Sequence, residues 1–461
     1  MTETATVAAS FRDPSGFVYV RDGVLLRQVN DSFAEDFGLL MRSGLHDELV
    51  ADGVLVPCES VSLNLAATEG AVAVLRPTRV PTVSYPYEWS FGQLKDAALL
   101  TLEAMKRALA KGMVLKDASA YNVQFLAGRP IFIDTLSFEA HVEGEPWVGY
   151  RQFCEHFVAP LALMSTVDIR LGKLLRSNIN GIPLDLASRL LHKSSRLNMG
   201  LAAHVHLHAR AQKSGGEAKR VNSARMTKTG LLALVDSLRR TVSNLNWEPT
   251  GTTWSEYYKD TNYTDEAMVH KKRLVSEFLY QITPAPRSCW DLGANDGSFS
   301  VIASQLGIDT VAWDFDPAAV ELAYRRVKQV GDKKLLPLVQ DLTNPSPGLG
   351  WANGERESLI ARGPVDVVLA LALVHHLAIG NNVPLPQVVE FFASLGRWAI
   401  VEFVPKDDSQ VVRMLSGRKD VFTNYTLDVF EKSLASTFRT VAKKRIPETE
   451  RTLYLLERIG R

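Results

Sequence analysis

The stretch Ser288 to Val301 reads SCWDLGANDGSFSV and decides the fold of the second half of the chain. A short apolar run carrying Asp291 leads into a turn marked by Gly293, Asn295 and Gly297, and apolar residues at helical spacing follow. This order predicts a strand, a tight turn and a helix start. Glycines permit a left-handed backbone and remove the Cβ that a ligand would meet, while free N–H groups at the helix start favour polar or anionic groups. The stretch therefore predicts a site for a nucleoside-like ligand.

An acidic residue on the next strand supports the same site. In a doubly wound sheet, an acidic residue about 20 residues past the glycine turn reaches the ribose hydroxyls of the ligand. Asp314 in DTVAWDFD stands at that distance. The alternative is that it caps the following helix, but Asp316 directly before Pro317 is the better cap candidate.

The spacing D-x-G-x-N-x-G that starts at Asp291 resembles motif I of the class I S-adenosylmethionine-dependent methyltransferases. Further segments of that family's pattern follow in order: LLPLVQD ending at Asp341, VDVVLALALVHHL and WAIVEFVP. The resemblance covers roughly Trp254 to the C-terminus. It implies a Rossmann-like seven-stranded sheet in an α/β fold, closed by the antiparallel hairpin of the C-terminal segment, with S-adenosyl-L-methionine as cofactor. The cofactor-binding residues that it implies are Asp291, Gly293, Asn295, Gly297, Asp314, Phe315, Asp341, Leu342 and Leu371, with Asp341 at the adenine amino group.

The candidate catalytic residues also follow strand ends. Alternating strands and helices predict a parallel sheet, and ligands bind at the carboxyl ends of its strands. His375 and His376 leave the fourth strand, where a histidine could deprotonate an oxygen or nitrogen nucleophile near neutral pH. Glu402 on the fifth strand completes the candidate set. The alternative is that the histidines only hydrogen-bond to backbone.

Length and composition set the organisation. At about 150 residues per domain, 461 residues suggest two large domains. We expect an α+β domain over residues 1–210, a linker over 211–228 that is basic and poor in apolar residues, and the methyltransferase domain over 229–461. A net charge of +1 gives no support to nucleic-acid binding, and three scattered cysteines indicate neither a zinc site nor disulfides. With no secretion signal and no apolar run of about 18 residues, a cytoplasmic protein without a membrane partner is expected.

The N-terminal half carries one clear hairpin and one clear helix. Asp22-Gly23 between two apolar runs predicts a hairpin. Ser90 to Ala110 has apolar residues at helical spacing, with Ser90 as the N-cap.

A second motif follows that helix. Asp117 and Asn122 have the spacing D-x-x-x-x-N, and a short predicted hairpin leads to Asp134. This order resembles the catalytic loop and metal-binding aspartate of protein-kinase-like and aminoglycoside-phosphotransferase-like folds, which implies that Asp117 positions a hydroxyl while Asn122 and Asp134 hold magnesium. The chain departs from that family at Leu115, where histidine is usual, and lacks a glycine-rich phosphate loop. The alternative is that these side chains cap turns.

Two further clusters have open interpretations. His204, His206 and His208 in HVHLH have the spacing of metal ligands on a strand or, in part, a helix, but no carboxylate completes a set, so packed or surface histidines are favoured over a metal site. The aromatic residues Trp254, Tyr257, Tyr258 and Tyr263 precede a predicted helix. They either close over the cofactor or anchor that helix.

The whole chain is similar to a bacterial group of nodulation-protein-like methyltransferases, including the segments SYPYEWSFGQLKDAALLTLE and LKDASAYN. We therefore predict methyl transfer to an oxygen or nitrogen atom of a small-molecule or carbohydrate-like acceptor. One alternative adds an ATP-dependent phosphotransferase in the N-terminal domain. The other makes that domain a non-catalytic binding module.

Overall fold

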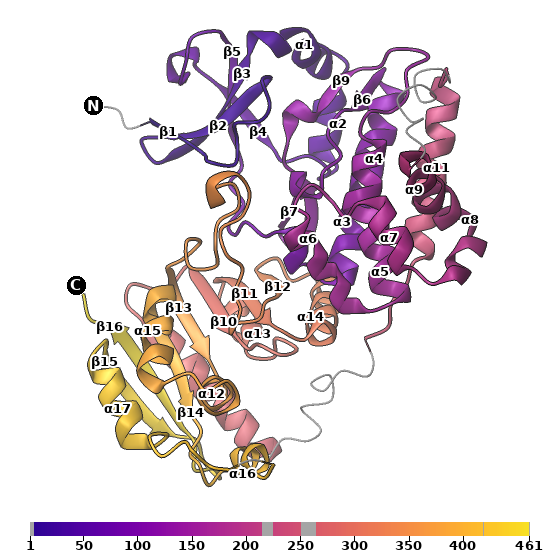
Figure 1. The fold of residues 1–461 in the computed structure, drawn as a ribbon. Coiled ribbons are helices and arrows are strands. Elements are labelled where there is room, and N and C mark those ends of the chain that lie inside the picture. Colours follow the sequence, from indigo (N-terminus) through magenta and orange to yellow (C-terminus); the bar gives the residue numbers. More distant parts are fainter. Residues whose placement is uncertain (1–3, 214–224, 250–263, 418, 461) are drawn as a thin grey trace. The chain divides into compact units, whose positions relative to one another are not determined.

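The computed structural model describes residues 4–213, 225–249, 264–417 and 419–460. It divides into two compact units (Figure 1). The first consists of Met1–Glu248 with Gly348–Arg356, and the second of Pro249–Pro347 with Glu357–Arg461. In the described part of the chain, no helix is both long and apolar enough to cross a membrane.

The first unit begins with a five-stranded antiparallel sheet in the order β1-β2-β3-β5-β4. Its strands are β1 (Thr4–Thr6), β2 (Gly16–Arg21), β3 (Val24–Asn30), β4 (Cys58–Val61) and β5 (Ala71–Pro77). The predicted hairpin is confirmed, because Asp22 and Gly23 both have positive φ and join β2 to β3. Helices α1 (Ala34–Arg42) and α2 (Leu45–Ala51) lie between β3 and β4 in the chain.

The long helix α3 (Phe91–Ala110) follows the sheet and is confirmed with its cap. The Ser90 hydroxyl accepts from the Gln93 N–H, and the Gln93 side chain accepts from the Ser90 N–H. Helix α11 (Lys228–Asn244) packs against α3, and Lys95 donates to the carbonyl oxygens of Ser243 and Leu245. We expected the methyltransferase domain to begin at residue 229 and so to include α11. These contacts place α11 in the first unit instead.

The remainder of the first unit is mostly helical. Together with the five-stranded antiparallel sheet, it confirms the expected α+β class. Two small sheets pair β6 (Met113–Leu115) with β9 (Phe138–Ala140) and β7 (Val123–Leu126) with β8 (Arg129–Phe132). The helices are α4 (Tyr150–Phe153), α5 (Ala159–Thr166), α6 (Leu174–Ser177), α7 (Leu184–Leu190), α8 (Met199–Leu201) and α9 (His208–Lys213). Pro183 precedes α7. Pro160 lies inside a continuous helical run, because α4, the π-helical turn Cys154–Val158 and α5 follow one another without a break, and its missing N–H removes one helical hydrogen bond there.

The second unit is built on a seven-stranded sheet in the order β12-β11-β10-β13-β14-β16-β15. Its strands are β10 (Ser288–Leu292), β11 (Asp309–Asp314), β12 (Leu335–Val339), β13 (Val365–Ala370), β14 (Gly396–Phe403), β15 (Phe438–Arg445) and β16 (Thr452–Arg458). The pairs from β12 to β14 are parallel, and β16 runs antiparallel to both β14 and β15. The predicted Rossmann-like sheet with an antiparallel C-terminal hairpin is confirmed.

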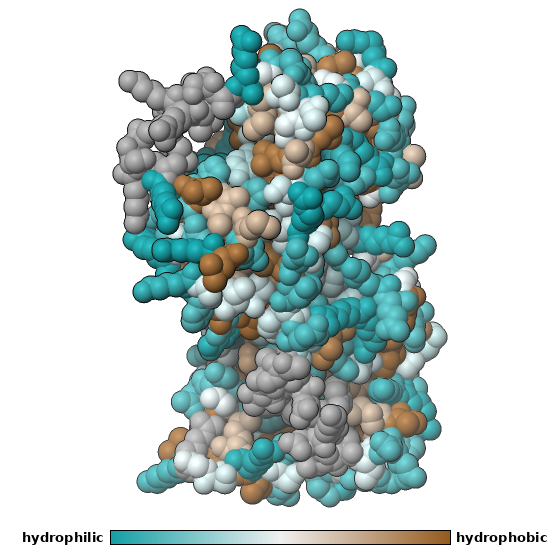
Figure 2. All heavy atoms as spheres, turned by 90° about the vertical axis from the view of Figure 1, so that its right-hand side faces the viewer, coloured by the Kyte–Doolittle hydropathy of each residue, from teal (hydrophilic) through white to brown (hydrophobic). Residues whose placement is uncertain are grey.

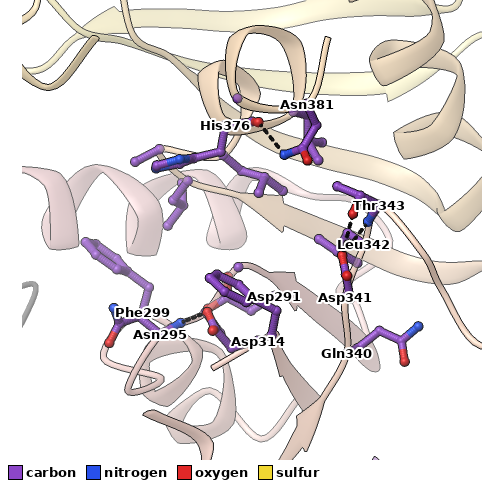
Figure 3. Close-up of a pocket in the computed structure, with 18 of the residues that line it drawn as sticks. Asp291, Asn295, Phe299, Asp314, Gln340, Asp341, Leu342, Thr343, His376 and Asn381 are labelled. Carbon is purple, nitrogen blue, oxygen red and sulfur yellow. Dashed lines mark hydrogen bonds between the residues drawn. The ribbon is translucent and has the colours of Figure 1, made fainter. Parts of the chain in front are cut away.

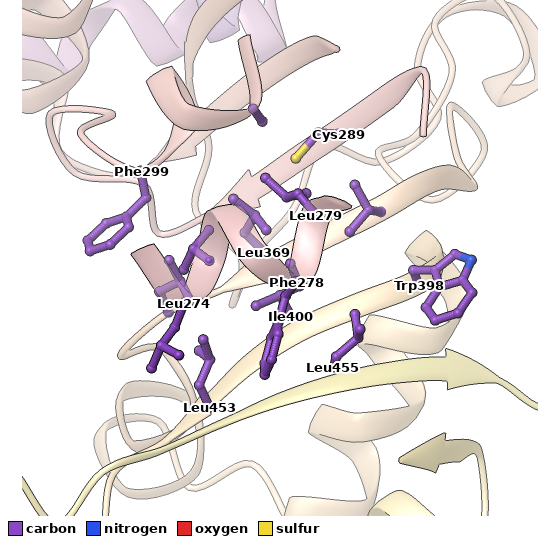
Figure 4. Close-up of a cluster of buried hydrophobic side chains, with 14 of the residues drawn as sticks. Leu274, Phe278, Leu279, Cys289, Phe299, Leu369, Trp398, Ile400, Leu453 and Leu455 are labelled. Atoms are coloured by element: carbon purple, nitrogen blue, oxygen red, sulfur yellow. The ribbon is translucent and has the colours of Figure 1, made fainter. Parts of the chain in front are cut away.

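Helices pack on this sheet through alternate strand residues. They are α12 (Asp265–Gln281), α13 (Ser300–Gln305), α14 (Pro317–Val330), α15 (Leu385–Leu395), α16 (Ser409–Leu415) and α17 (Leu427–Ala435). Figure 4 shows Leu274, Phe278 and Leu279 of α12 in one cluster with Leu369, Ile400 and Leu455 of three strands. Successive side chains of a strand point to opposite faces of the sheet. The strand residues of this cluster therefore share the face that α12 covers, and together they form one hydrophobic core.

Candidate functional site

A cavity of about 360 Å³ lies at the carboxyl ends of the parallel strands (Figure 3). Most of the candidate cofactor residues line it. They are Asp291, Gly293, Asn295, Asp314, Phe315, Asp341, Leu342 and Leu371. Gly297 does not line the cavity, because its N–H closes the turn onto the Ala294 carbonyl oxygen and its Cα faces Arg326.

The glycine turn gives the cavity its floor. Gly293 and Asn295 have φ values of 72° and 53°, so asparagine adopts the left-handed conformation that its position requires. A Cβ at Gly293 would lie 3.1 Å from Leu373 Cδ1, at the edge of the cavity. Leu373 would have to move for any side chain at this position, and that movement would fill cavity space.

Several backbone amides of the turn donate hydrogen bonds within the protein. Gly293 and Ala294 both donate to the carbonyl oxygen of Trp313 at 2.9 Å, and the Asn295 N–H donates to Asp314 Oδ2 at 2.7 Å. Helix α13 begins only at Ser300. The N–H groups of Gly293, Ala294 and Asn295 are therefore not available to a ligand, whereas the side chains of Asp291, Asp314 and Asp341 line the cavity.

Asp314 is a carboxylate held in place at the end of β11. Its two oxygens accept from the backbone N–H groups of Asn295 at 2.7 Å and Asp316 at 2.8 Å, and only 6% of the residue is exposed. Burial raises the pKa of Asp314 to about 6, although these backbone N–H bonds oppose the increase. Asp316 caps α14 by accepting from the Ala318 N–H at 2.8 Å, as the sequence predicts. Asp314 therefore lines the cavity, whereas Asp316 caps a helix.

Asp291 lies at the same edge of the cavity, at the end of β10. Its Oδ2 accepts a hydrogen bond from the Ser300 hydroxyl at 2.6 Å, and the residue is buried. Burial raises the pKa of Asp291 to about 7, while Ser300 and the positive charge of Lys271 lower it. The carboxyl group is therefore protonated more readily than an exposed aspartate.

The end of the cavity near β12 combines an exposed ring with a polar strand end. Phe315 is half exposed, and Asp341 Oδ1 accepts from the N–H and hydroxyl of Thr343. Gln340 also lines the cavity, and its buried Nε2 has no acceptor among the residues that the structure describes. The sequence analysis missed Gln340, whose only signal was its position beside Asp341.

The two candidate histidines lie in different environments. His376 lines the cavity at the start of the π-helical turn His376–Gly380 after β13, and Figure 3 shows it across from Asp291 and Phe299. Burial, with Arg451, lowers the pKa of His376 to about 4, so the ring is neutral at pH 7. His375 is fully buried behind it, with ring centroids 4.2 Å apart, and does not line the cavity.

Glu402 is fully buried and reaches the cavity only through Lys271. Its carboxylate binds Lys271 Nζ at 2.5 Å and Arg451 Nη1 at 3.4 Å, and Arg451 Nε donates to Asp408 at 2.7 Å. Lys271 lines the cavity beside Phe299, with its ammonium 4.5 Å from the ring centroid. The sequence analysis missed Lys271, because its place at the cavity depends on the packing of α12 and its ion pair with Glu402 is distant in the chain.

The kinase-like motif of the first unit carries an ion pair instead of an open carboxylate. Arg27 Nη1 binds Asp134 Oδ1, and the Ser137 hydroxyl donates to Asp134 Oδ2. Burial raises the pKa of Asp134, but Arg27 and Ser137 outweigh that effect and hold it below its usual value. The Asn122 amide donates to Ser137 Oγ at 3.3 Å. A magnesium ion at Asp134 would have to displace Arg27.

The clustered histidines are packed polar residues. Tyr150 OH and Ser237 Oγ lie 2.8 and 3.0 Å from the two ring nitrogens of His204. His206 lies 2.8 Å from each of two serine hydroxyls. Within the described ranges, no group of three or more histidine, cysteine, aspartate or glutamate side chains could hold a metal ion. The expected aromatic cluster, from Trp254 to Tyr263, lies outside the described residues.

Comparison with known proteins relates the chain to one relative over its full length. No family model matches it. It is 38% identical over 461 residues to the nodulation protein NoeA of Rhizobium meliloti strain 1021, covering 98% of this chain and 96% of that protein.

Solved structures match about half of the chain. WbdD, described in one structure as a bifunctional kinase-methyltransferase, is 15% identical with a TM-score of 0.32, over 47% of this chain and 46% of WbdD, about half its length. The magnesium protoporphyrin IX methyltransferase ChlM of Synechocystis PCC 6803 is 18% identical with a TM-score of 0.32, over 45% of this chain and 93% of ChlM. The PH0226 protein of Pyrococcus horikoshii OT3 is 16% identical with a TM-score of 0.32, over 45% of this chain and 100% of that protein.

Proposed function

The chain belongs to the family of the nodulation protein NoeA, and we propose that its second unit binds S-adenosyl-L-methionine and transfers the methyl group to an oxygen or nitrogen nucleophile. The observation that carries the proposal is Asp314. A buried carboxylate, fixed by two backbone N–H groups beside a glycine turn, has lone pairs left for two hydroxyl donors.

The residues of the cavity fit the cofactor. Asp314 would accept from the ribose hydroxyls, and the exposed ring of Phe315 with Leu342 would hold the adenine between apolar surfaces. Asp341 Oδ2 and Gln340 Nε2, which have no partner among the residues that the structure describes, would meet the polar edge of the adenine. Gly293 leaves the space that a Cβ would close.

Charged side chains at the other end suit the amino-acid part of the cofactor. Lys271 offers a cation for the carboxylate, and Asp291 a carboxylate for the ammonium group. Glu402 positions Lys271, since removing Glu402 would leave a buried ammonium without its partner. Glu402 thus acts through Lys271, whereas the sequence analysis placed it in direct contact with the reaction.

The bound cofactor supplies a methyl group on a positively charged sulfur. With the cofactor bound, the neutral ring of His376 would accept the proton of the acceptor oxygen or nitrogen as that atom takes the methyl group. His375 supports the His376 ring from behind. Orientation of the acceptor next to the methyl group would supply much of the rate gain.

The acceptor class follows from size and charge. A cavity of about 360 Å³ and a net charge of +1 favour a small-molecule or carbohydrate-like acceptor over a nucleic acid. The three cysteines are unpaired, which fits a reducing cytoplasm.

Methyl transfer from isotopically labelled S-adenosylmethionine into a small-molecule extract of the producing cells tests the proposal. Wild type should label a product, and Gly293→Val should not, because its side chain would meet Leu373. Gly307→Ala is the matched control, since Gly307 has a φ of 82° with no atom within 4 Å of its Cβ position. Equal labelling by wild type and Gly293→Val would refute the assigned cavity.

For the first unit, the Arg27–Asp134 pair favours a binding module over a phosphotransferase. A bound cation would face the guanidinium of Arg27 instead of a free carboxylate. Deleting residues 1–248, which removes α11 together with the helix α3 that it packs against, should then abolish methylation and leave cofactor affinity intact. Retained methylation by the shortened chain would refute this role.

A further inference from the structure

A second cavity, of about 420 Å³, lies in the first unit and carries a concentrated positive charge. It forms where α7, the 3-10 segment Lys193–Leu197, the π-helical turn Ala202–Leu207 and the start of α9 meet. Four cationic side chains line it: Arg189, Lys193, Arg196 and Arg210. We call this cavity the basic pocket.

The positive charges of the basic pocket are largely unbalanced. Asp185 is its one lining carboxylate among the residues that the structure describes, and it pairs with Arg189 at 2.8 Å. Lys193, Arg196 and Arg210 have no carboxylate partner in the described ranges. The lining therefore carries a formal charge of +3, whereas the whole chain carries +1.

A buried histidine, His206, lies in the wall of the basic pocket close enough to its cations to feel their charge. His206 is 5% exposed, with Ser188 Oγ at 2.8 Å from Nδ1 and Ser195 Oγ at 2.8 Å from Nε2. Ser195 donates its proton to the His192 carbonyl oxygen at 2.6 Å, so it must accept from Nε2–H, and Nδ1 must accept from Ser188. Burial lowers the pKa of His206, and the charges of Arg196 and Arg210 lower it further.

The clustered cations of the basic pocket favour the binding of a multiply charged anion. Like charges around one hollow repel each other, and a multiply charged anion would relieve that repulsion. Guanidinium groups match the oxygen atoms of phosphate with paired donors, and lysine adds a point charge. A single carboxylate would leave most of the +3 charge uncompensated, whereas a diphosphate or phosphomonoester would offset two or three charges.

We propose that the basic pocket binds the phosphate or diphosphate group of a phosphorylated small molecule. The cavity volume lies within the roughly 300–1,000 Å³ of small-ligand sites. The proposal stands on the first unit alone and does not depend on methyl transfer. It gives the expected binding module a ligand class.

The surface beside the pocket offers one competing explanation. Leu197 and Met199 are each 87% exposed, and an exposed apolar group next to cations is also typical of proteins that touch anionic lipid surfaces. Figure 1 places α7, α8 and α9 together, and Figure 2 views the molecule from that side, where hydrophobic and hydrophilic side chains alternate. We favour the soluble ligand, because the charges line a cavity instead of a flat face.

Calorimetric titration of the full chain with pyrophosphate tests the proposal. One pyrophosphate should bind per chain, more tightly than inorganic phosphate, and more weakly as salt is added. The double variant Arg196→Gln/Arg210→Gln should lose at least about tenfold in affinity. The matched control Arg79→Gln/Lys173→Gln removes two charges from exposed positions of the same unit outside the pocket and should bind as wild type does.

Several outcomes would overturn the proposal. Equal losses in the two double variants would mean nonspecific attraction, and no binding at millimolar pyrophosphate would mean no site. Binding to phosphatidylglycerol vesicles without binding of pyrophosphate would assign the surface to lipid. As a second readout, proton resonances of His206 should show a higher pKa with pyrophosphate bound, and an unchanged pKa would place the anion elsewhere.

Discussion

Replacing Asp314 by alanine should separate ligand binding from folding. The variant removes the acceptor of two ribose hydroxyls, each worth roughly 1.5 kcal/mol at the lower end for a bond to a charged group. The total of about 3 kcal/mol corresponds to roughly a hundredfold in affinity. The N–H groups of Asn295 and Asp316 also lose their acceptor, which loosens the turn. Removing a buried carboxyl whose pKa is raised offsets part of that cost in stability.

Calorimetric titration with S-adenosylhomocysteine measures the change, and thermal melts measure stability. Asp316→Ala is the matched control, because it removes a neighbouring aspartate that caps α14 and does not line the cavity. It should cost about 1 kcal/mol of stability with affinity unchanged. Affinity of Asp314→Ala within about twofold of wild type, or lost binding in Asp316→Ala alone, would refute the assignment of the ribose to Asp314.

Three further predictions follow from the two units. His376→Gln should slow labelling of the acceptor by about a hundredfold or more without changing affinity for S-adenosylhomocysteine. At saturating cofactor, the wild-type rate should fall as the pH approaches the His376 pKa of about 4. An unchanged rate in the variant would remove His376 as the base. Because burial raises the pKa of Asp291 from 3.8 to about 7, its stabilising contribution is present at acid pH and is lost as the pH rises through 7. Asp291→Asn should therefore raise the melting temperature at pH 8 and leave it unchanged at pH 3.5, whereas no gain at pH 8 would contradict the raised pKa. Because Arg27 and Ser137 bind both oxygens of Asp134, Asp134→Asn should leave any thermal shift with magnesium-ATP unchanged; a shift lost in this variant would favour the phosphotransferase.

Local sequence patterns were sufficient for the strand–turn–helix unit around Gly293. Its strand is apolar, its turn needs left-handed residues, and Asn295 supplies one where glycine is more usual. The cap at Ser90 and the hairpin at Asp22-Gly23 were predicted for the same reason. In each case the signal lies within a few consecutive residues. The strand ends followed from the alternation of elements, which brought Asp314 and Asp341 to one edge.

The charged pairs could not be predicted, because their partners are far apart in the chain. Arg27 and Asp134 are 107 residues apart, and nothing local to Asp134 shows that an arginine occupies it. Lys271 lies on the buried side of an amphipathic helix, where its pairing with Glu402 depends on how α12 packs on the sheet. Burial also decides that His376 and not His375 lines the cavity, since the two residues are adjacent and chemically identical.

The crystal structure of the protein with S-adenosylhomocysteine is the most direct test of the proposed function. Our account predicts the ribose hydroxyls within hydrogen-bonding distance of Asp314, the adenine beside Phe315 with its amino group near Asp341, and the sulfur facing the His376 side of the cavity. A ligand bound outside this cavity, or a saturated crystal with the cavity empty, would contradict it.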